Sequence, residues 1–309
     1  MNVKYRSYQT EDFIKIRDML VDSFRESDNL GNWLIDRWNF CRAVSHTMHD
    51  TFDSWEKTVG IWEDETGTIV GVVNSEGEES GEAFFQVRFP LSSVILEEMF
   101  VFSESSLTVQ DKGKRVIRLR IPDGDSIRES IAHSRGYKKL DWDDTISILP
   151  LSNLGSVDLP QGYRIQSGPD VSSEAKALAH AKAFGYFDFD DARDTTVPLA
   201  FERMKLAPDY RADLDLSIVD ESGEVVSFCT LWYDTWNQHG ILEPVGTIPT
   251  ARKKGLGRAV ILEGLHRIAD CGAKSAYVGS TMDFYKRLGF EAVFKSYVWE
   301  KTFDSNDVT

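Results

Sequence analysis

The stretch "IPTARKKGLGRAV", residues 248–260, brings three basic side chains and two glycines together in a strongly acidic chain. The strand-like segment "ILEPVGTI" leads into it, and the helix-like segment "RAVILEGL" follows its second glycine. A helix N-terminus has unpaired amides and partial positive charge, so it binds anions, and phosphate most commonly. The stretch therefore predicts a loop between a strand and a helix that binds a pyrophosphate.

The glycines of this stretch support the same interpretation. Gly255 and Gly257 have no Cβ, so the backbone can approach a phosphate closely, and the basic residues 252–254 raise the local potential. The Walker loop and the G-x-G-x-x-G dinucleotide loop are both excluded, because neither pattern is present. Taken alone, the segment could also be a solvated basic turn; the strand before it and the helix after it favour phosphate binding.

The composition predicts a globular protein of the cytoplasm. Hydrophobic residues make up 41% and aromatic residues 12% of the 309 residues, which is enough to fill a core. A net charge of -15 argues against nonspecific binding to nucleic acid or to an anionic membrane. Cys41, Cys229 and Cys271 have neither disulfide nor zinc spacing, so we expect reduced thiols and no metal. No apolar run approaches the roughly 20 residues of a transmembrane helix.

The sequence predicts two copies of the same order of strands and helices. Periodicity and turn residues predict strand, two helices, three strands, helix, strand, helix and strand, once in 1–151 and again in 163–309. The Ser-, Gly- and Pro-rich stretch 152–162 between them predicts a linker. The alternative is two unrelated α/β domains that share this alternation. Only the second copy has the basic loop, because the first has "LSSVILEEMF" at 91–100.

Two motifs of the second copy resemble those of the GNAT acyltransferases, which use acetyl-CoA. Arg252-Lys253-Lys254-Gly255-Leu256-Gly257 fits the signature Q/R-x-x-G-x-G/A, which in that family follows the fourth strand. "FYKRLGF", residues 284–290, resembles the family's tyrosine in a short helix before Leu-Gly-Phe. The resemblance covers about 163–301. Residues 1–151 match in element order alone, as in tandem GNAT proteins with a degenerate N-terminal copy that does not bind CoA.

The resemblance implies a mixed α/β fold with two tandem GNAT-like domains. Each domain would have a mostly antiparallel, twisted sheet flanked by helices. In the C-terminal domain the parallel fourth and fifth strands would splay apart to admit the pantetheine arm of CoA. Pro244 lacks an N–H and Gly246 eases a bulge, so both offer a local cause for the splay. The implied CoA-binding residues are Val245, Gly246, Thr247, Arg252, Lys253, Lys254, Gly255, Leu256, Gly257 and Arg258.

Two residues are candidates for the chemistry. Glu243 is the candidate base, and it shares strand alternation with Val245 and Thr247 if no bulge intervenes. Its alternatives are a surface strand residue or a ligand of a substrate ammonium group, and His239 is a weaker candidate base. Tyr285 would protonate, or donate a hydrogen bond to, the leaving thiolate. The alternative for Tyr285 is a packed aromatic residue of an amphipathic helix.

The expected reaction is transfer of an acetyl group from acetyl-CoA to a primary amine. Aromatic and acidic residues at 184–194 and 231–239 suit a cationic small molecule or peptide, although the first stretch could equally be a solvated acidic loop. Two alternatives stay open. The protein could be a noncatalytic CoA-binding regulator, or a tandem acyltransferase similar to mycothiol synthase.

Overall fold

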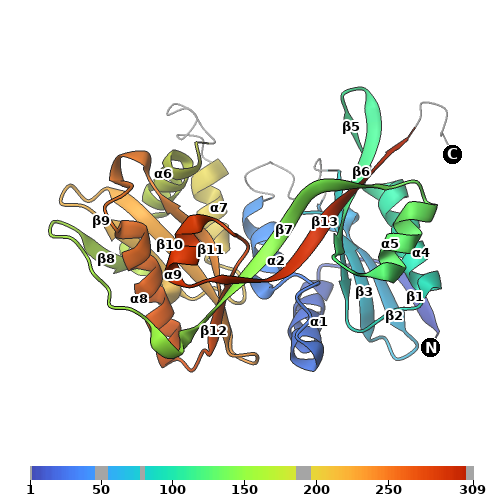
Figure 1. Cartoon of the computed structure of the whole chain (residues 1–309), viewed down its shortest axis with the longest axis horizontal. Helices are drawn as coiled ribbons and strands as arrows, with labels where there is room; N and C mark the ends of the chain where they lie inside the picture. Colours follow the sequence, from blue (N-terminus) through green and yellow to red (C-terminus); the bar gives the residue numbers. More distant parts are fainter. Residues whose placement is uncertain (1, 46–54, 77–80, 186–195, 304–309) are drawn as a thin grey trace. The chain divides into compact units, whose positions relative to one another are not determined.

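The computed structural model describes residues 2–45, 55–76, 81–185 and 196–303 of the chain, and Figure 1 labels the helices and strands. Two compact units are present. Unit 1 comprises residues 1–34, 51–146 and 292–309, and unit 2 comprises 35–50 and 147–291. This division differs from the expected boundary at 152–162, because each unit contains segments from both halves of the sequence.

Unit 1 has a sheet in the order β1-β2-β3-β4-β6-β13, with β5 added on β6. Its neighbouring strands are antiparallel, except for the parallel pair β4 and β6. The elements are β1 (Val3–Ser7), α1 (Asp12–Ser27), a 3-10 turn (Trp55–Thr58), β2 (Gly60–Asp64), β3 (Ile69–Asn74), β4 (Glu82–Val87), α4 (Ser93–Ser106), β5 (Val109–Asp111), β6 (Lys114–Pro122), α5 (Ser126–Ser134) and β13 (Glu291–Phe303). The strand β7 (Lys138–Pro150) begins in unit 1 and ends in unit 2.

Unit 2 has a sheet in the order β7-β12-β11-β10-β9-β8. Here the parallel pair is β11 and β12. The elements are α2 (Ile35–Phe40), a π-helical turn (Cys41–Ser45), β8 (Arg164–Ser167), α6 (Ser173–Phe184), α7 (Thr196–Met204), β9 (Asp215–Val219), β10 (Val225–Asp234), β11 (His239–Thr247), α8 (Leu256–Asp270), β12 (Ser275–Val278) and α9 (Asp283–Leu288). Single 3-10 turns cover Leu151–Asn153, Gly168–Asp170, Ala212–Leu214 and Pro249–Ala251.

The two halves of the sequence follow the same element order, as the repeat predicts. Their last strands, however, are exchanged between the units. The end of β7 pairs with β12 in unit 2, and β13 pairs with β6 in unit 1 over residues 296–303. A hydrophobic pattern identifies a strand but not its partner, so the sequence does not reveal this exchange.

In each unit the parallel strand pair separates after a few residues. β11 pairs with β12 only from His239 to Ile241, although β11 continues to Thr247. β4 pairs with β6 only at Glu82 and Ala83, although β4 continues to Val87. The splay expected for unit 2 is therefore present, and unit 1 has it at the corresponding place.

Helices cover both faces of the unit 2 sheet. Gly264 of α8 lies against Leu231 of β10, with no room for a Cβ. On the opposite face, Gly246 lies against Phe228 and Ala183, and Ala183 belongs to α6. Since Leu231 and Phe228 are three residues apart on one strand, they point to opposite faces. The strand β11, which carries the predicted site, is thus held between α8 and α6.

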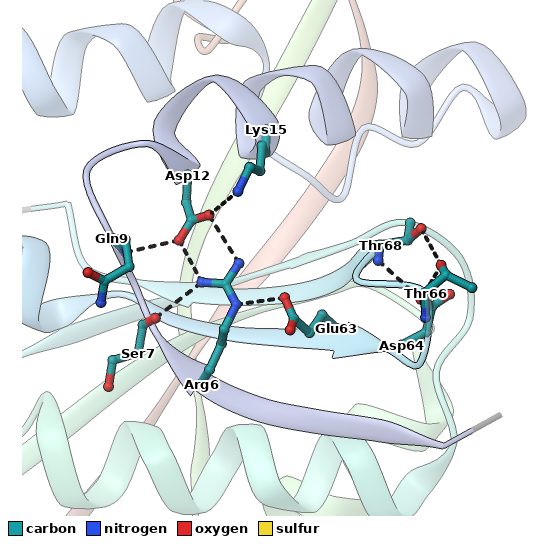
Figure 2. Close-up of polar contacts among 9 residues, drawn as sticks. All are labelled: Arg6, Ser7, Gln9, Asp12, Lys15, Glu63, Asp64, Thr66 and Thr68. Carbon is teal, nitrogen blue, oxygen red and sulfur yellow. Dashed lines mark hydrogen bonds and ion pairs between the residues drawn. The ribbon is translucent and has the colours of Figure 1, made fainter.

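A network of charged groups fixes the start of α1 in unit 1 (Figure 2). Arg6 donates two hydrogen bonds to the buried carboxylate of Asp12, at 2.6 and 3.0 Å, and a third to Glu63 at 2.6 Å. The Gln9 amide and the Lys15 ammonium also donate to Asp12. Burial alone would raise the pKa of Asp12, but these donors outweigh it and lower the pKa to about 2.

Asp12→Asn should destabilise unit 1 by about 2 kcal/mol at neutral pH, because it weakens charge-assisted hydrogen bonds to a buried group. The contribution of Asp12 is present above about pH 4, where an unfolded Asp is ionised. It disappears as the pH falls towards 2, so the difference between variant and wild type should shrink in acid. Urea unfolding at pH 7 and pH 3 measures this. Lys15→Ala is the control: it removes a largely exposed donor to the same carboxylate and should cost little.

Candidate functional site

The strand β11 contains a bulge at the expected place. Leu242 lies opposite Leu231 of β10 and Val245 lies opposite Cys229. Two residues of β11, Glu243 and Pro244, therefore face a single residue of β10, Thr230. The extra residue interrupts the ladder just beyond the last residue that pairs with β12. The bulge thus lies at Glu243 and Pro244, before Gly246.

This bulge corrects the expectation that Glu243 shares one face with Val245 and Thr247. Gly240 lies against Ile268 of α8, and Thr247 lies against Gly257 of the same helix. Residues 240 and 247 are seven apart, so a regular strand would place them on opposite faces. Since both face α8, the extra residue of the bulge reverses the alternation. Counted from Gly240, Glu243 falls on the face covered by α6, whereas Thr247 is on the face of α8.

Beyond the bulge, β11 presents a free backbone edge to the splayed gap. The Ile248 amide donates to the Val226 carbonyl on the β10 side. In an antiparallel ladder the direction alternates, so the backbone groups of Val245 and Thr247 point away from β10. Their amides have no acceptor among the residues that the structure describes, since β12 no longer pairs here. The amides of the expected main-chain positions, Val245 and Thr247, are therefore available to a ligand, whereas the Thr247 carbonyl accepts from the Arg252 guanidinium.

The N-terminus of α8 presents a second row of free amides. The helix begins at Leu256, and its N-cap is Gly255, which has φ 83° and offers no side-chain cap. Lys253 also has a positive φ of 63°. Within the described part of the chain, none of the amides of residues 253–258 has an acceptor. The first bond of the helix runs from the Ala259 amide to the Gly255 carbonyl. This loop has the geometry of an anion cradle.

The two rows of amides meet at Gly257. A Cβ at this position would lie 3.2 Å from Thr247 Oγ1 and 3.3 Å from the ring of Phe284 on α9. Thr247 Oγ1 in turn shares a hydrogen bond of 2.8 Å with Ser227 Oγ. Leu256 is buried in the core, so only its main chain is available to a ligand. The loop, the open edge of β11 and α9 are therefore adjacent.

The basic side chains of the loop have different surroundings. The Arg252 guanidinium donates to the carbonyls of Thr247, at 3.1 Å, and of Ala183, at 2.8 Å. It therefore fastens the loop to the end of β11 and to α6. Lys254 donates to the hydroxyl of Tyr163 at 3.2 Å. Lys253 and Arg258 are exposed, and neither has a hydrogen-bond or ion-pair partner in the described ranges. These two cations are the ones free for an anionic ligand.

Tyr285 is buried on α9, between the rings of Phe284 and Phe290 at 5.1 and 5.8 Å. Its hydroxyl has no hydrogen-bond partner among the residues described. Burial raises the pKa of Tyr285 well above its usual value, and the charges of Cys229 and Glu243 raise it further. The phenol therefore stays protonated at neutral pH, and the charge of Glu243 acts on it. Tyr285 is both a packed aromatic residue and a potential hydrogen-bond donor.

The remaining candidates differ in their surroundings. His239 is buried at the start of β11, with its ring edge-on to Tyr277 at 5.1 Å. In 231–239, Trp232 and Tyr233 belong to the core, while Trp236 is 68% exposed. Asp234 is buried and accepts from the amides of residues 236 and 237, so it holds the turn. Most of the aromatic and acidic stretch 184–194 lies outside the described residues.

In the ranges that the structure describes, each helix is too short or too polar to cross a bilayer. In the same ranges, no group of three or more His, Cys, Asp or Glu side chains is arranged to hold a metal ion.

Comparison with known proteins shows a similarity in sequence over part of the chain and in fold over nearly all of it. Residues 183–290 match the sequence profile of the Acetyltransferase (GNAT) family. No curated protein has a significantly similar sequence. The fold is similar to a GCN5-related N-acetyltransferase from Sphaerobacter thermophilus, with a TM-score of 0.60 and 13% identity, over 97% of this chain and 95% of the other. It is also similar to a tandem GNAT protein from the clavulanic acid biosynthesis pathway, with a TM-score of 0.61 and 11% identity, over 99% of this chain and 100% of the other.

The matched segment contains the basic loop, the bulged strand and the helix of Tyr285, and the whole chain has the fold of a tandem GNAT protein. Residues 183–290 are therefore similar in sequence to the GNAT acetyltransferases, and the chain as a whole is similar to them in fold.

Proposed function

We propose that unit 2 binds acetyl-CoA and transfers its acetyl group to a primary amine. The observation that carries this proposal is the meeting of two rows of free amides at Gly257. The amides of residues 253–258, with the free cations of Lys253 and Arg258, suit a pyrophosphate. The free amides of Val245 and Thr247 suit the carbonyl groups of a pantetheine arm.

Three groups of the chain would each carry out one part of the reaction. Bound acetyl-CoA supplies the acetyl thioester. Glu243, at the bulge, removes a proton from the attacking amine. The Val245 amide stabilises negative charge on a carbonyl oxygen, since it has no acceptor of its own. Tyr285, kept protonated by burial, donates a hydrogen bond or a proton to the departing thiolate.

The proposed acceptor is a cationic small molecule or peptide. The net charge of -15 favours the approach of cations, and the base in the site is itself a carboxylate. The proposed location is the cytoplasm, which is supported by three free cysteines, Cys41, Cys229 and Cys271.

Unit 1 is proposed not to bind a second coenzyme, because its corresponding edge is already occupied. The Arg88 amide donates to the Val70 carbonyl, so the backbone groups of Val87 point into the splayed gap, as those of Thr247 do in unit 2. The side chain of Asn32 pairs with both: it accepts from the Val87 amide at 2.8 Å and donates to the Val87 carbonyl at 2.7 Å. In unit 2 the Thr247 carbonyl also accepts from a side chain, that of Arg252, but the Thr247 amide has no partner corresponding to Asn32 among the described residues.

The neighbouring residues complete this closure of unit 1. Gln86 accepts from the amide of Trp33 at 2.7 Å, and the Trp33 ring packs on Phe84 at 4.8 Å. The helix that follows β4 begins at Ser93, and its N-cap is Ser92 rather than a glycine. The segment 91–100 contains no basic residue. Unit 1 therefore has neither the open strand edge nor the anion cradle.

Asn32→Ala should destabilise unit 1 by about 2 kcal/mol, because it leaves the Val87 amide without a partner and the Val87 carbonyl with only the long hydrogen bond from Asn29. It should not create a second coenzyme site, since the anion cradle is still missing. Urea unfolding and calorimetric titration with acetyl-CoA measure the two effects. Asn29→Ala is the control: Asn29 donates only a long hydrogen bond of 3.4 Å to the same carbonyl, and its other contact, from the Gly31 amide at 2.9 Å, is local to the loop. A second equivalent of bound coenzyme would contradict this view of unit 1.

The reaction is tested by incubating the protein with acetyl-CoA and a panel of amines while free thiol is measured. The panel contains aliphatic polyamines, amino sugars and peptides with free N-termini. We expect thiol release that depends on one class of cationic amine, together with an acetylated product by mass spectrometry. Coenzyme binding without thiol release on any amine would instead favour a noncatalytic, CoA-binding role. Release with longer acyl-CoA donors only would favour a different acyl group.

A further inference from the structure

The bulge that carries Glu243 is anchored by two buried side chains of β10. A bulge leaves the backbone of its extra residue without a ladder partner. Here the Trp232 indole N–H donates to the Glu243 carbonyl at 2.7 Å. Trp232 is completely buried, so its indole has one position. The carbonyl of the proposed base is thus held by a side chain rather than by the ladder.

The second anchor is Thr230, the single residue opposite the bulge. Its hydroxyl donates to the Asp215 carboxylate at 2.7 Å, across the β9–β10 pair. The same carboxylate accepts from the Lys176 ammonium and, at 2.9 Å, from the Tyr210 hydroxyl. Thr230 and Asp215 are both at least 95% buried. Burial alone would raise the pKa of Asp215, but Lys176 and the hydroxyl donors keep it lowered and the group ionised.

We propose that Thr230 and Trp232 are positioning residues that fix the position of Glu243. The register of β10 against β11 changes at Thr230, and this change places the Glu243 side chain on the opposite face of the sheet from Val245 and Thr247. The charged network on Asp215 fixes Thr230, and the indole of Trp232 fixes the Glu243 backbone. This inference rests on the proposed function, because it gives the anchors a role through the proposed base.

The test distinguishes the effect of the Thr230 hydroxyl from the effect of the shape of the side chain. Thr230→Val keeps the shape and removes the donor, whereas Thr230→Ser keeps the donor and removes a methyl group. We expect Thr230→Val to lower kcat by about tenfold to a hundredfold, because small misplacements of a catalytic group are costly. Thr230→Ser should stay within about threefold of wild type. KM for acetyl-CoA should change little in both, because the cradle is untouched.

Trp232→Phe provides an independent variant, and the chain offers matched controls in unit 1. Trp299 is equally buried, but its indole N–H has no acceptor among the described residues. The buried hydroxyl of Thr58 donates to the Trp55 carbonyl at 2.7 Å. Trp299→Phe and Thr58→Val should therefore leave kcat unchanged, while Trp232→Phe should lower it as Thr230→Val does. All rates are measured well below each variant's unfolding temperature.

The possible outcomes are distinct. Loss of kcat in Thr230→Val and Trp232→Phe, with rescue in Thr230→Ser and no loss in the controls, supports the inference. If the wild-type protein turns over and Thr230→Val has the same kcat, the inference is overturned. Equal losses of kcat in Thr230→Val and Thr230→Ser would also overturn it. If Trp232→Phe does not fold, the Val and Ser pair at position 230 decides alone. A wild-type protein without turnover on any amine would instead overturn the proposed function, and with it this inference.

Discussion

Gly257→Val should weaken acetyl-CoA binding at least about a hundredfold, which corresponds to about 3 kcal/mol. Even a Cβ would lie 3.2 Å from Thr247 Oγ1 and 3.3 Å from the Phe284 ring. The additional methyl groups of Val must then project into the space where the free amides of the loop and of β11 meet. Calorimetric titration measures the affinity, and thermal unfolding should show only a modest change, because Gly257 lies at a partly exposed helix start.

Gly264 provides the matched control for this variant, because it lies two turns further along the same helix. A Cβ on Gly264 would collide with the buried side chain of Leu231. Gly264→Ala should therefore destabilise unit 2 by about 1–3 kcal/mol through overpacking. Its folded fraction should still bind acetyl-CoA. Undiminished coenzyme affinity in Gly257→Val would refute the cradle, whatever the stability of the variant.

Tyr285→Phe should lower kcat about a hundredfold, while the affinity for acetyl-CoA changes little. The variant keeps the ring that packs against Phe284 and Phe290 and removes only the hydroxyl. Steady-state kinetics and binding measured on the same preparation separate the two effects. The control is Tyr233→Phe, which removes a hydroxyl that donates to the Cys271 carbonyl at 3.0 Å. This control should retain its turnover.

The pH dependence offers a second view of Tyr285. Burial raises the pKa of its phenol, so the group stays protonated as the pH rises through the normal range of tyrosine. The wild-type kcat should therefore not fall between pH 7 and about 10 because of this group. A fall in that range that disappears in Tyr285→Phe would show a normal or lowered pKa, and it would contradict the buried position.

The sequence predicted the loop and its neighbours well, because these features are local. Gly255 is the left-handed N-cap of α8, Gly257 lies close to the side chains of Thr247 and Phe284, and the pattern after them identifies the helix. Ser172 is the N-cap of α6, a local feature of the same kind, and its hydroxyl accepts from the Ala175 amide at 3.2 Å. The repeated order of elements was also visible, because each strand and helix has its own period of hydrophobic residues.

Features that depend on strand register could not be predicted in this way. The bulge at Glu243 and Pro244 reverses the alternation of β11, and it depends on Thr230 of another strand. The exchange of β7 and β13 changes which segments form each unit, although neither strand has an unusual pattern. The guanidinium of Arg252 donates to two carbonyl groups, and no sequence motif reveals these contacts.

The central claim is that the chain has one coenzyme site, in unit 2, and that unit 1 closes its own edge with Asn32. Calorimetric titration of the wild-type chain with acetyl-CoA tests this claim most directly. The account predicts one equivalent bound per chain, and no measurable binding by Gly257→Val at the same concentrations. Two equivalents per chain, or one equivalent that persists in Gly257→Val, would contradict it.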